Sequence, residues 1–393
     1  MADTPKIRFK GFTDDWEWRK LGEVATFING RAYSQDELLC SGKYKVLRVG
    51  NFYTNDSWYY SDMELDDKYY AEEGDLLYTW SATFGPHIWH GDKVIYHYHI
   101  WKIELSEHLE KKFALQLLEK DKATILSDKN GSAMVHITKT GMEEKSVLLP
   151  INIEEQSKIG MCLDSIDHLI TFHQRKCDAA KVLKKYMLQK MFPRNGRKVP
   201  EIRFAGFAGD WEQRKLGEVF KEYSEKNHPE LPALTVIQGG GTVKREESDR
   251  NLMYNKSNLF GYKVVREGDF IVHLRSFEGG LEKASSDGII SPAYHTFHGD
   301  NVDSRFFYSY FRSFEFIKKK LLPHVYGIRD GRSIDIDSMK KIEIPYTSYE
   351  EQQAIGDYFD HLDHLITLHQ RKCDELKEVK RFMLQNMFPQ KGQ

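Results

Sequence analysis

Two pairs of residues that commonly ligate metal ions recur in the chain at helical spacing. His173 precedes Cys177 by four positions, and His369 precedes Cys373 by the same interval. Residues four apart share one face of a helix, so each pair could offer an imidazole and a thiolate to a zinc ion. Cysteine also packs as a small apolar side chain, with histidine as a tolerated polar neighbour. Both interpretations stay open, although we favour packing and predict no metal site.

The rest of the sequence lacks the residue patterns of catalysis. It contains no GxxxxGK[ST] phosphate-binding loop and no Asn-Pro-Pro-Phe/Tyr segment of the amino-methyltransferase kind. Residues 238–241 read Gln-Gly-Gly-Gly without a GxGxxG frame, so we interpret them as a flexible loop. No spacing of carboxylates singles out a nuclease or metal cluster. We therefore predict that the chain is not an enzyme and has no catalytic residues.

The His and Cys residues lie in two long segments of nearly the same sequence, 154–193 and 350–389. Apolar residues in both follow a four-three spacing, which is typical of a heptad seam. Each segment is predicted to form a helix of about 40 residues, roughly 60 Å long, which ends near a Met-Phe-Pro sequence. The seam positions are Ile159, Leu163, Ile166 and Ile170 in the first copy and Ile355, Phe359, Leu362 and Ile366 in the second.

A helix with such a seam needs a partner, and the chain supplies a near copy. We predict that the two helices form a long antiparallel coiled coil, related by a pseudo-twofold axis, with one globular insert at each end. The alternative is a pair of unconnected amphipathic helices, each packed on its own insert.

A second repeat lies before each insert, where residues 5–24 and 200–219 match at a spacing of about 195 residues. The inserts between the repeats look almost unrelated, yet Glu-Gly-Asp followed by two apolar residues recurs at 73–77 and 267–271. Strand-like segments such as 44–50 and 90–104 alternate with helix-like ones such as 109–120 and 306–322. We predict an α+β protein with two mixed α/β domains of one fold and different surfaces. The predicted boundaries are 1–150 and 200–345 for these domains, and 151–199 and 346–393 for the repeated helices.

Composition narrows the class of protein further. With 393 residues and a formal net charge of −2, the chain exceeds a usual single domain and is close to neutral. Near neutrality argues mildly against a free-standing nucleic-acid-binding domain but leaves room for local basic surface. The start lacks the apolar core of a signal peptide, and no run of about 18 apolar residues occurs. The four cysteines form no CxxC pair, so we expect a cytoplasmic protein, away from the membrane and without disulfides.

Taken in order, these motifs resemble the DNA-specificity (S) subunits of type I restriction–modification systems. The resemblance rests on PxIRFxGF…W…KLGEV, the TrpSerAlaThrPheGly-type loop after GlyAspLeuLeu, the Pro-then-Glu-Gln helix start, and HLITxHQRKCD…MLQxMFP. The frame motifs occur twice, and the resemblance covers essentially the whole chain. The sequence departs from the usual pattern mainly at Cys177 and Cys373, where leucine would be less surprising.

The resemblance implies that each insert is a target-recognition domain for one half of a bipartite, asymmetric DNA sequence, with the coiled coil setting the spacing. It implies a non-catalytic subunit that directs adenine methylation and restriction by two methyltransferase (M) and two restriction (R) subunits. S-adenosylmethionine, ATP and magnesium are then expected on those partners, and no cofactor on this chain. Four apolar residues beside the seam either dock M subunits or thicken the coiled-coil core: Ile151, Leu169, Phe172 and Leu365.

Readout of double-stranded DNA needs Lys and Arg on phosphates, and polar side chains on base edges. In the first insert the candidates are Lys45, Arg48, Asn51, Tyr53, Trp80 and Ser81. In the second they are Gln238, Lys244, Arg245, Arg275, Ser276, Arg329 and Arg332. For each of them, the alternative is an ordinary exposed side chain.

Two other classes of function compete with this interpretation. One is a coiled-coil scaffold or adaptor that holds two ligand-binding domains apart without DNA readout. The other is a single-chain restriction–modification enzyme, against which the missing methyltransferase motifs argue.

Overall fold

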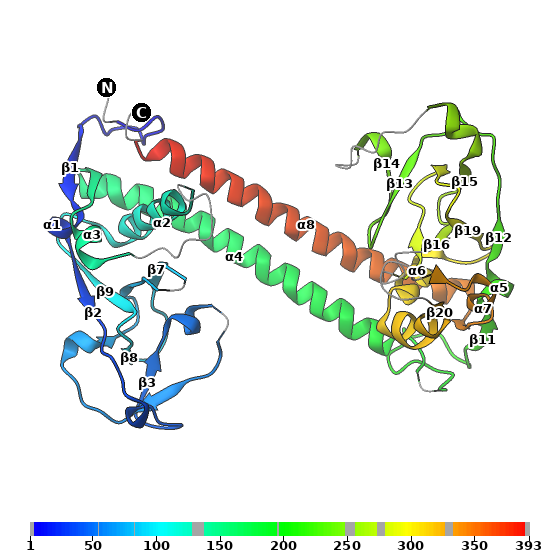
Figure 1. The fold of residues 1–393 in the computed structure, drawn as a ribbon, viewed down its shortest axis with the longest axis horizontal. Coiled ribbons are helices and arrows are strands. Elements are labelled where there is room, and N and C mark those ends of the chain that lie inside the picture. Colours follow the sequence, from blue (N-terminus) through cyan, green and yellow to red (C-terminus); the bar gives the residue numbers. More distant parts are fainter. Residues whose placement is uncertain are drawn as a thin grey trace. The chain divides into compact units, whose positions relative to one another are not determined.

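A computed structural model gives the fold of the chain (Figure 1). It describes residues 4–53, 55–81, 83–127, 137–194, 196–247, 256–272, 280–326 and 333–389. The chain divides into two units, Met1–His173 with Arg371–Gln393, and Gln174–Gln370. Each unit holds one mixed domain and parts of two long helices, α4 (Ile153–Lys190) and α8 (Tyr349–Met387). The predicted α+β class is confirmed.

The domain of the first unit is built on two four-stranded sheets. The first has the order β2-β9-β6-β7 and is antiparallel, whereas the second has the order β4-β3-β8-β5 and includes the parallel pair β3–β8. Its strands are β1 (Trp16–Lys20), β2 (Ala25–Asn29), β3 (Tyr44–Leu47), β4 (Tyr59–Ser61), β5 (Tyr70–Ala71), β6 (Leu76–Thr79), β7 (Gly85–Ile88), β8 (Val94–Tyr96), β9 (Ile100–Leu105) and β10 (Ser146–Pro150). Its helices are α1 (Leu21–Val24), α2 (Lys111–Ser127) and α3 (Lys139–Glu143).

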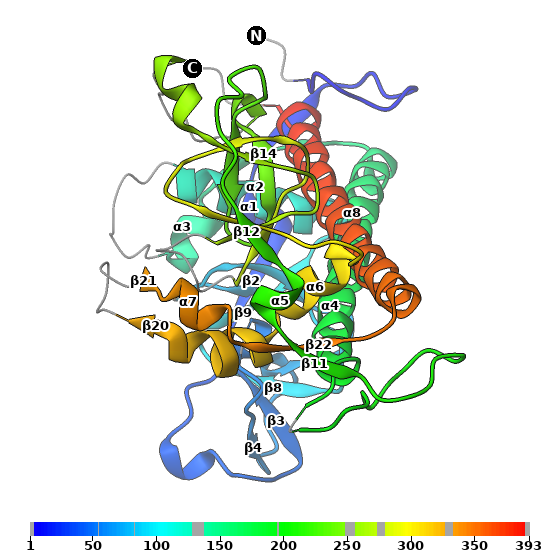
Figure 2. The ribbon, with the colours of Figure 1, turned by 90° about the vertical axis from the view of Figure 1, so that its right-hand side faces the viewer.

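The domain of the second unit has one four-stranded sheet, and its other strands pair in two-stranded sheets. The sheet β12-β19-β16-β17 corresponds to the first sheet above. β11 pairs with β22 (Figure 2), as β1 pairs with β10 in the first unit. The strands are β11 (Glu212–Lys215), β12 (Lys221–Tyr223), β13 (Leu234–Ile237), β14 (Gly241–Lys244), β15 (Lys263–Val265), β16 (Phe270–Val272), β17 (Glu282–Lys283), β18 (Gly288–Ile290), β19 (His295–His298), β20 (Val325–Tyr326), β21 (Ser333–Ile334) and β22 (Glu343–Tyr346). The helices are α5 (Leu216–Val219), α6 (Ser304–Phe311), a π-helical turn (Glu315–Leu321) and α7 (Ile336–Met339).

The recurring Glu-Gly-Asp sequence forms the same tight turn before β6 and before β16. Gly74 and Gly268 have φ angles of 87° and 89°, a left-handed conformation that favours glycine. The following aspartate closes the turn: Asp75 accepts a hydrogen bond from the backbone N–H of Glu72 at 2.9 Å, and Asp269 from that of Arg266 at 2.7 Å. The motif recurs because the turn requires it.

The long helices pair in an antiparallel manner inside each unit. In the first unit, the Lys380 ammonium binds Asp167 at 2.7 Å, and the Cys373 thiol donates to the carbonyl oxygen of Ile170 at 3.6 Å. In the second unit, the corresponding contacts join Lys184 to Asp363 and the Cys177 thiol to the carbonyl of Ile366. Buried seam residues are Ile159, Leu163, Ile355, Phe359 and Leu362, and half-buried ones are Ile166, Ile170 and Ile366.

The repeated sequence at each helix start anchors the helix to its domain. In the first unit, the Gln156 side chain accepts a hydrogen bond from the backbone of Glu110 and donates to the carbonyls of His108 and Pro150. Gln352 makes the corresponding bonds to the backbone of Asp303 and Thr347 in the second unit. Both glutamine side chains are fully buried, and each is satisfied by backbone groups on two sides.

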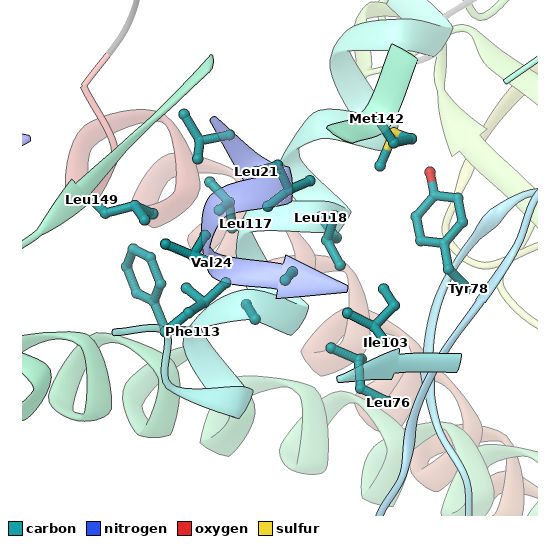
Figure 3. Packing of buried hydrophobic residues seen from close by; sticks show 14 of the residues in the cluster. Leu21, Val24, Leu76, Tyr78, Ile103, Phe113, Leu117, Leu118, Met142 and Leu149 are labelled. Carbon is teal, nitrogen blue, oxygen red and sulfur yellow. The ribbon is translucent and has the colours of Figure 1, made fainter. Parts of the chain in front are cut away.

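Apolar side chains from the domain and from both helices form one core in each unit. Figure 3 shows part of the first core, where Leu21 and Val24 of α1 lie against Leu117 of α2. The Met-Phe sequences at the ends of the long helices belong to these cores, with Met387 and Phe388 in the first and Met191 and Phe192 in the second. Their conserved place in the two cores explains why this sequence repeats.

Two predicted elements differ from the structure. The strand expected over 90–104 is two strands, because the chain turns at 97–99 and passes from the sheet of β8 to the sheet of β9. The helix expected over 306–322 is interrupted at Ser313, whose hydroxyl accepts a hydrogen bond from the backbone of Phe316 and starts the π-helical turn. Local pattern alone does not reveal such changes of direction.

Candidate nucleic-acid interface

Four of the predicted DNA-contacting residues, Lys45, Arg48, Asn51 and Tyr53, lie on β3 or in the connection from β3 to β4. Lys45 lies over the ring of Trp58 at 5.5 Å, and the Arg48 guanidinium lies over Tyr59 at 4.2 Å. The Asn51 side chain accepts from the backbone of Arg48 and donates to the carbonyls of Asn55 and Ser57, each at 3.0 Å. Asn51 therefore shapes this connection, while stacking orients the two cations.

Tyr53 joins this connection to β6 and β7. The Tyr53 side chain is 41% exposed, and its hydroxyl lies 3.2 Å from His87 Nε2 and 3.4 Å from Thr79 Oγ1. The His87 ring also stacks on Phe52, with 4.1 Å between centroids. Burial, helped by the charge of Lys122, lowers the pKa of His87 to about 4. At neutral pH the imidazole is therefore uncharged and can both donate and accept a hydrogen bond.

Trp80 and Ser81 follow β6, beside the turn at 97–99. The indole N–H of Trp80 donates to the carbonyl of Tyr98 at 2.9 Å, and its ring meets His99 edge-on. Burial lowers the pKa of His97 to about 4, with smaller effects from His99 and Arg48. The contacts of Tyr53 with Thr79 and His87 hold loop 48–53 against β6 and β7, next to Trp80 and Ser81 at the end of β6.

The described candidates of the second domain lie on the hairpin of β13 and β14, and they are not brought together. Gln238 is exposed in the turn of this hairpin, next to the pair Ile237–Gly241. Lys244 is exposed at the opposite end, paired with Leu234, and Arg245 follows it with its guanidinium 5.7 Å from the ring of Tyr262. The other four candidates, Arg275, Ser276, Arg329 and Arg332, lie outside the described residues.

A buried carboxylate, Glu282, holds the hairpin turn. The residue is 4% exposed, and it accepts hydrogen bonds from the backbone N–H of Gly239 at 2.6 Å and of Gly241 at 3.2 Å. The Tyr308 hydroxyl and the Arg312 guanidinium also donate to Glu282, each at 3.1 Å. Four donors around one carboxylate fix the backbone that presents Gln238.

Sequence reasoning missed His87, Glu282 and Arg312. The Glu-Gly-Asp repeat aligns β6 with β16, but the strands that carry His87 and Glu282 are too short and too different to align by sequence. Only the pairing of His87 with Leu77, and of Glu282 with Ile271, reveals that they correspond.

Within the described ranges, no group of three or more His, Cys, Asp or Glu side chains is arranged to hold a metal ion. Cys177 and Cys373 are buried in the helix seam, and each thiol lies near a carbonyl oxygen of the facing helix. The part of the chain that the structure describes also holds no helix with the length and apolarity to cross a membrane.

Comparisons with known proteins agree with this architecture. The type I restriction modification DNA specificity domain matches residues 13–181 and again residues 208–378. The chain therefore belongs to this family and carries two copies of its domain. It is a specificity subunit, a non-catalytic component of a type I restriction enzyme.

Relatives of similar length occur in Methanocaldococcus jannaschii. The type I restriction enzyme MjaVIII specificity subunit is 25% identical over 394 residues, which covers 94% of this chain and 91% of the relative. The putative type I restriction enzyme MjaX specificity subunit is 23% identical over 411 residues, with the same coverage. The crystal structure of the type I restriction–modification S subunit from M. genitalium matches 99% of this chain and 100% of that chain, with a TM-score of 0.68 and 14% identity. This last similarity concerns the fold.

Proposed function

We propose that the domains at 1–150 and 200–345 each read one half of a bipartite, asymmetric DNA target. The repeated helical segments, 151–199 and 346–393, set the spacing of the two halves. One observation carries the proposal: equivalent strands bear unlike connections. β3 leads to β4 through residues 48–58, whereas β13 leads to β14 through residues 238–240 only. A common scaffold with different loops supports recognition of two different half-sites.

In the first domain, the reading surface is the one formed by loop 48–53 and the turn after β6. Lys45 and Arg48 are assigned to phosphates, and Tyr53, Trp80 and Ser81 to base edges or base stacking. Asn51 acts through the shape of the loop, since its amide is already engaged there. Neutral imidazoles at positions 87 and 97 add hydrogen-bonding capacity without adding charge.

In the second domain, Gln238 reads a base edge from the hairpin turn, and Lys244 and Arg245 contact phosphates. Arg275, Ser276, Arg329 and Arg332 complete the proposed set. The variants Arg275→Ala and Arg332→Ala test the last group through the methylated motif and the affinity for target DNA. If both variants keep the wild-type motif and affinity, Arg275 and Arg332 do not contact the DNA target.

The chain acts in this proposal with two M and two R subunits in the cytoplasm. Those partners supply adenine methylation, DNA translocation and cleavage, and they carry S-adenosylmethionine, ATP and magnesium. Three exposed apolar side chains are available for docking M subunits, Ile151 just before α4 and Leu169 and Phe172 on it. A subunit with a net charge of −2 relies on its partners for many phosphate contacts, so the isolated chain binds DNA weakly.

Long-read methylome sequencing of cells with and without the chain tests the proposal. We expect a methylated motif with two unlike halves at a fixed spacing, present only when the chain is present. Binding measurements on the chain alone and with M subunits then test whether tight DNA binding requires the M subunits. Tight, sequence-specific binding by the chain alone would contradict this requirement. A methylome that is the same with and without the chain would reject the proposal that the chain determines the methylated motif.

A further inference from the structure

A basic groove lies in the second unit, where the end of α4 meets the corner between α6 and the π-helical turn. It has a volume of about 320 Å³. Its described lining holds five basic residues, Lys181, Lys184, Lys185, Arg194 and Arg312, and one acidic residue, Asp363. The sequence placed Lys184 in the heptad seam as a polar residue, and it did not single out Lys181 or Lys185.

The charges in this groove are only partly compensated. Lys184 is paired with Asp363 at 2.6 Å, and Arg312 is paired with Glu282 at 3.1 Å. Lys181 and Lys185 are exposed, and neither forms an ion pair with any described residue. The Nε atom of Arg194 is buried without a hydrogen-bond partner in the described part of the chain. The groove therefore presents excess positive charge to an anionic ligand.

The groove continues the candidate DNA surface of the second domain. Arg312 lines the groove and also binds Glu282, which holds the turn at Gly239. A Cβ atom on Gly239 would lie 2.7 Å from the Arg312 guanidinium, so the turn packs directly against the groove wall. A duplex that meets Gln238 in this turn is thereby brought to the groove.

We propose that this groove binds the sugar–phosphate backbone of the DNA beside the half-site read by the second domain. The inference rests on the proposed function and adds a sequence-independent contact to it. Lysine ammonium groups bind phosphates as mobile point charges, and neutralising phosphates releases counterions. Protein–protein interfaces, in contrast, are depleted in lysine at their core. Lys181 and Lys185 therefore favour DNA over an M subunit as the occupant.

The double substitution Lys181→Gln/Lys185→Gln tests the proposal in the complex with M subunits. Binding to a duplex that carries the methylated motif is measured by fluorescence anisotropy over a series of salt concentrations. Each lost phosphate contact lowers the salt-dependence slope by about 1, so we expect a decrease of up to about 2 and at least about tenfold weaker binding at physiological salt. The methylated motif is expected to stay unchanged, because phosphate contacts carry no sequence information.

The internal repeat supplies a matched control, Lys377→Gln/Arg381→Gln. These residues hold the corresponding positions on α8, but Lys377 is paired with Asp374 at 4.0 Å and Arg381 is paired with Glu378. The control removes the same charge from the corresponding positions of the other long helix, and we expect it to leave the salt slope nearly unchanged. Equal effects of the two double variants would show a general charge effect and overturn the proposal.

Three further results are distinguishable. If the wild-type complex binds its target but Lys181→Gln/Lys185→Gln changes neither slope nor affinity, the groove proposal fails and the proposed function stands. If that variant loses M subunits while the assembled remainder binds DNA normally, the groove is a protein-docking surface and the proposal also fails. If the wild-type complex shows no sequence-specific binding, the proposed function itself fails. An unchanged melting temperature of the variant excludes misfolding as the cause of weaker binding.

Discussion

His87 of the first domain and Glu282 of the second occupy the same position in equivalent sheets. His87 pairs with Leu77 across β7 and β6, and Glu282 pairs with Ile271 across β17 and β16. The first contacts Tyr53 in the connection after β3, and the second holds Gly239 in the connection after β13. One strand position therefore shapes the reading loop in both domains, with a different side chain for each loop.

Glu282→Gln is expected to disturb the second half-site alone. The amide keeps one acceptor oxygen where the carboxylate accepted four hydrogen bonds, so the Gly239 turn and Arg312 lose their common anchor. Losing hydrogen bonds to a charged group costs roughly 1.5–3 kcal/mol each. We expect at least about tenfold weaker target binding and relaxed methylation at the second half of the motif, read by methylome sequencing.

Glu246→Gln serves as the control for the Glu282 variant. It removes the same charge from an exposed residue of the same domain. We expect the wild-type motif and affinity from the control. Retention of both by Glu282→Gln as well would show that the carboxylate does not set the reading loop.

The first domain is expected to lose stability as the pH falls from 6.5 towards 4. Burial and Lys122 lower the pKa of His87 from 6.5 to about 4, so the unfolded chain binds more protons than the folded chain in this range. The free energy of unfolding therefore rises with pH. One such histidine lowers it by about 2 kcal/mol when the pH falls from 7.5 to 5. Urea unfolding followed by tryptophan fluorescence at the two pH values measures the change.

His87→Gln separates this effect from other titrations. The difference in unfolding free energy between pH 7.5 and pH 5 is expected to shrink by about 2 kcal/mol in this variant. The exposed His108 offers the control His108→Gln, which should keep the wild-type pH dependence. The same pH dependence in His87→Gln and in the wild type would exclude a neutral, buried imidazole at position 87.

The frame was more predictable from the sequence than the reading surfaces. The heptad spacing predicted the two long helices because seam residues such as Ile159 and Phe359 must be buried. The repeat predicted their antiparallel pairing, which the structure shows within each unit. Glu-Gly-Asp gave a turn because Gly74 and Gly268 need positive φ angles. Positions such as Glu282 depend on strand register, and register in short strands is fixed by tertiary packing.

The glycine inside each long helix is expected to be required for close packing, and more strictly so in the first copy. A Cβ atom on Gly160 would lie 2.6 Å from the backbone nitrogen of Phe113, which cannot move without shifting α2. On Gly356 the nearest atom is a side-chain oxygen of Asp303 at 2.9 Å. Alanine favours a helix by about 1 kcal/mol, but overpacking costs about 1–3 kcal/mol.

Thermal unfolding of the two alanine variants therefore ranks them. Gly160→Ala should lower the melting temperature by several degrees, at about 2–4 °C per kcal/mol for larger domains. Gly356→Ala should lower it less, since the nearest atom to give way is the Asp303 carboxylate and not a backbone atom. A Gly160→Ala variant as stable as the wild type would mean that α2 does not pack this closely on α4.

The repeated Arg–Glu ion pairs at the helix starts are expected to matter far more for stability than surface ion pairs. Arg203 donates to both oxygens of Glu351, at 2.7 and 2.8 Å, and Trp211 donates to the same carboxylate at 3.1 Å. The Glu351 side chain is 1% exposed, so Arg203→Ala leaves a buried charge without its partner, at a cost of about 3–5 kcal/mol. Arg371→Ala breaks only an exposed pair with Glu375 and should cost under about 1 kcal/mol.

The double variant Arg203→Ala/Glu351→Gln should recover part of the loss, because it removes the buried charge. Equal unfolding free energies for Arg203→Ala and Arg371→Ala would contradict a role for this buried pair in joining the domain to α8.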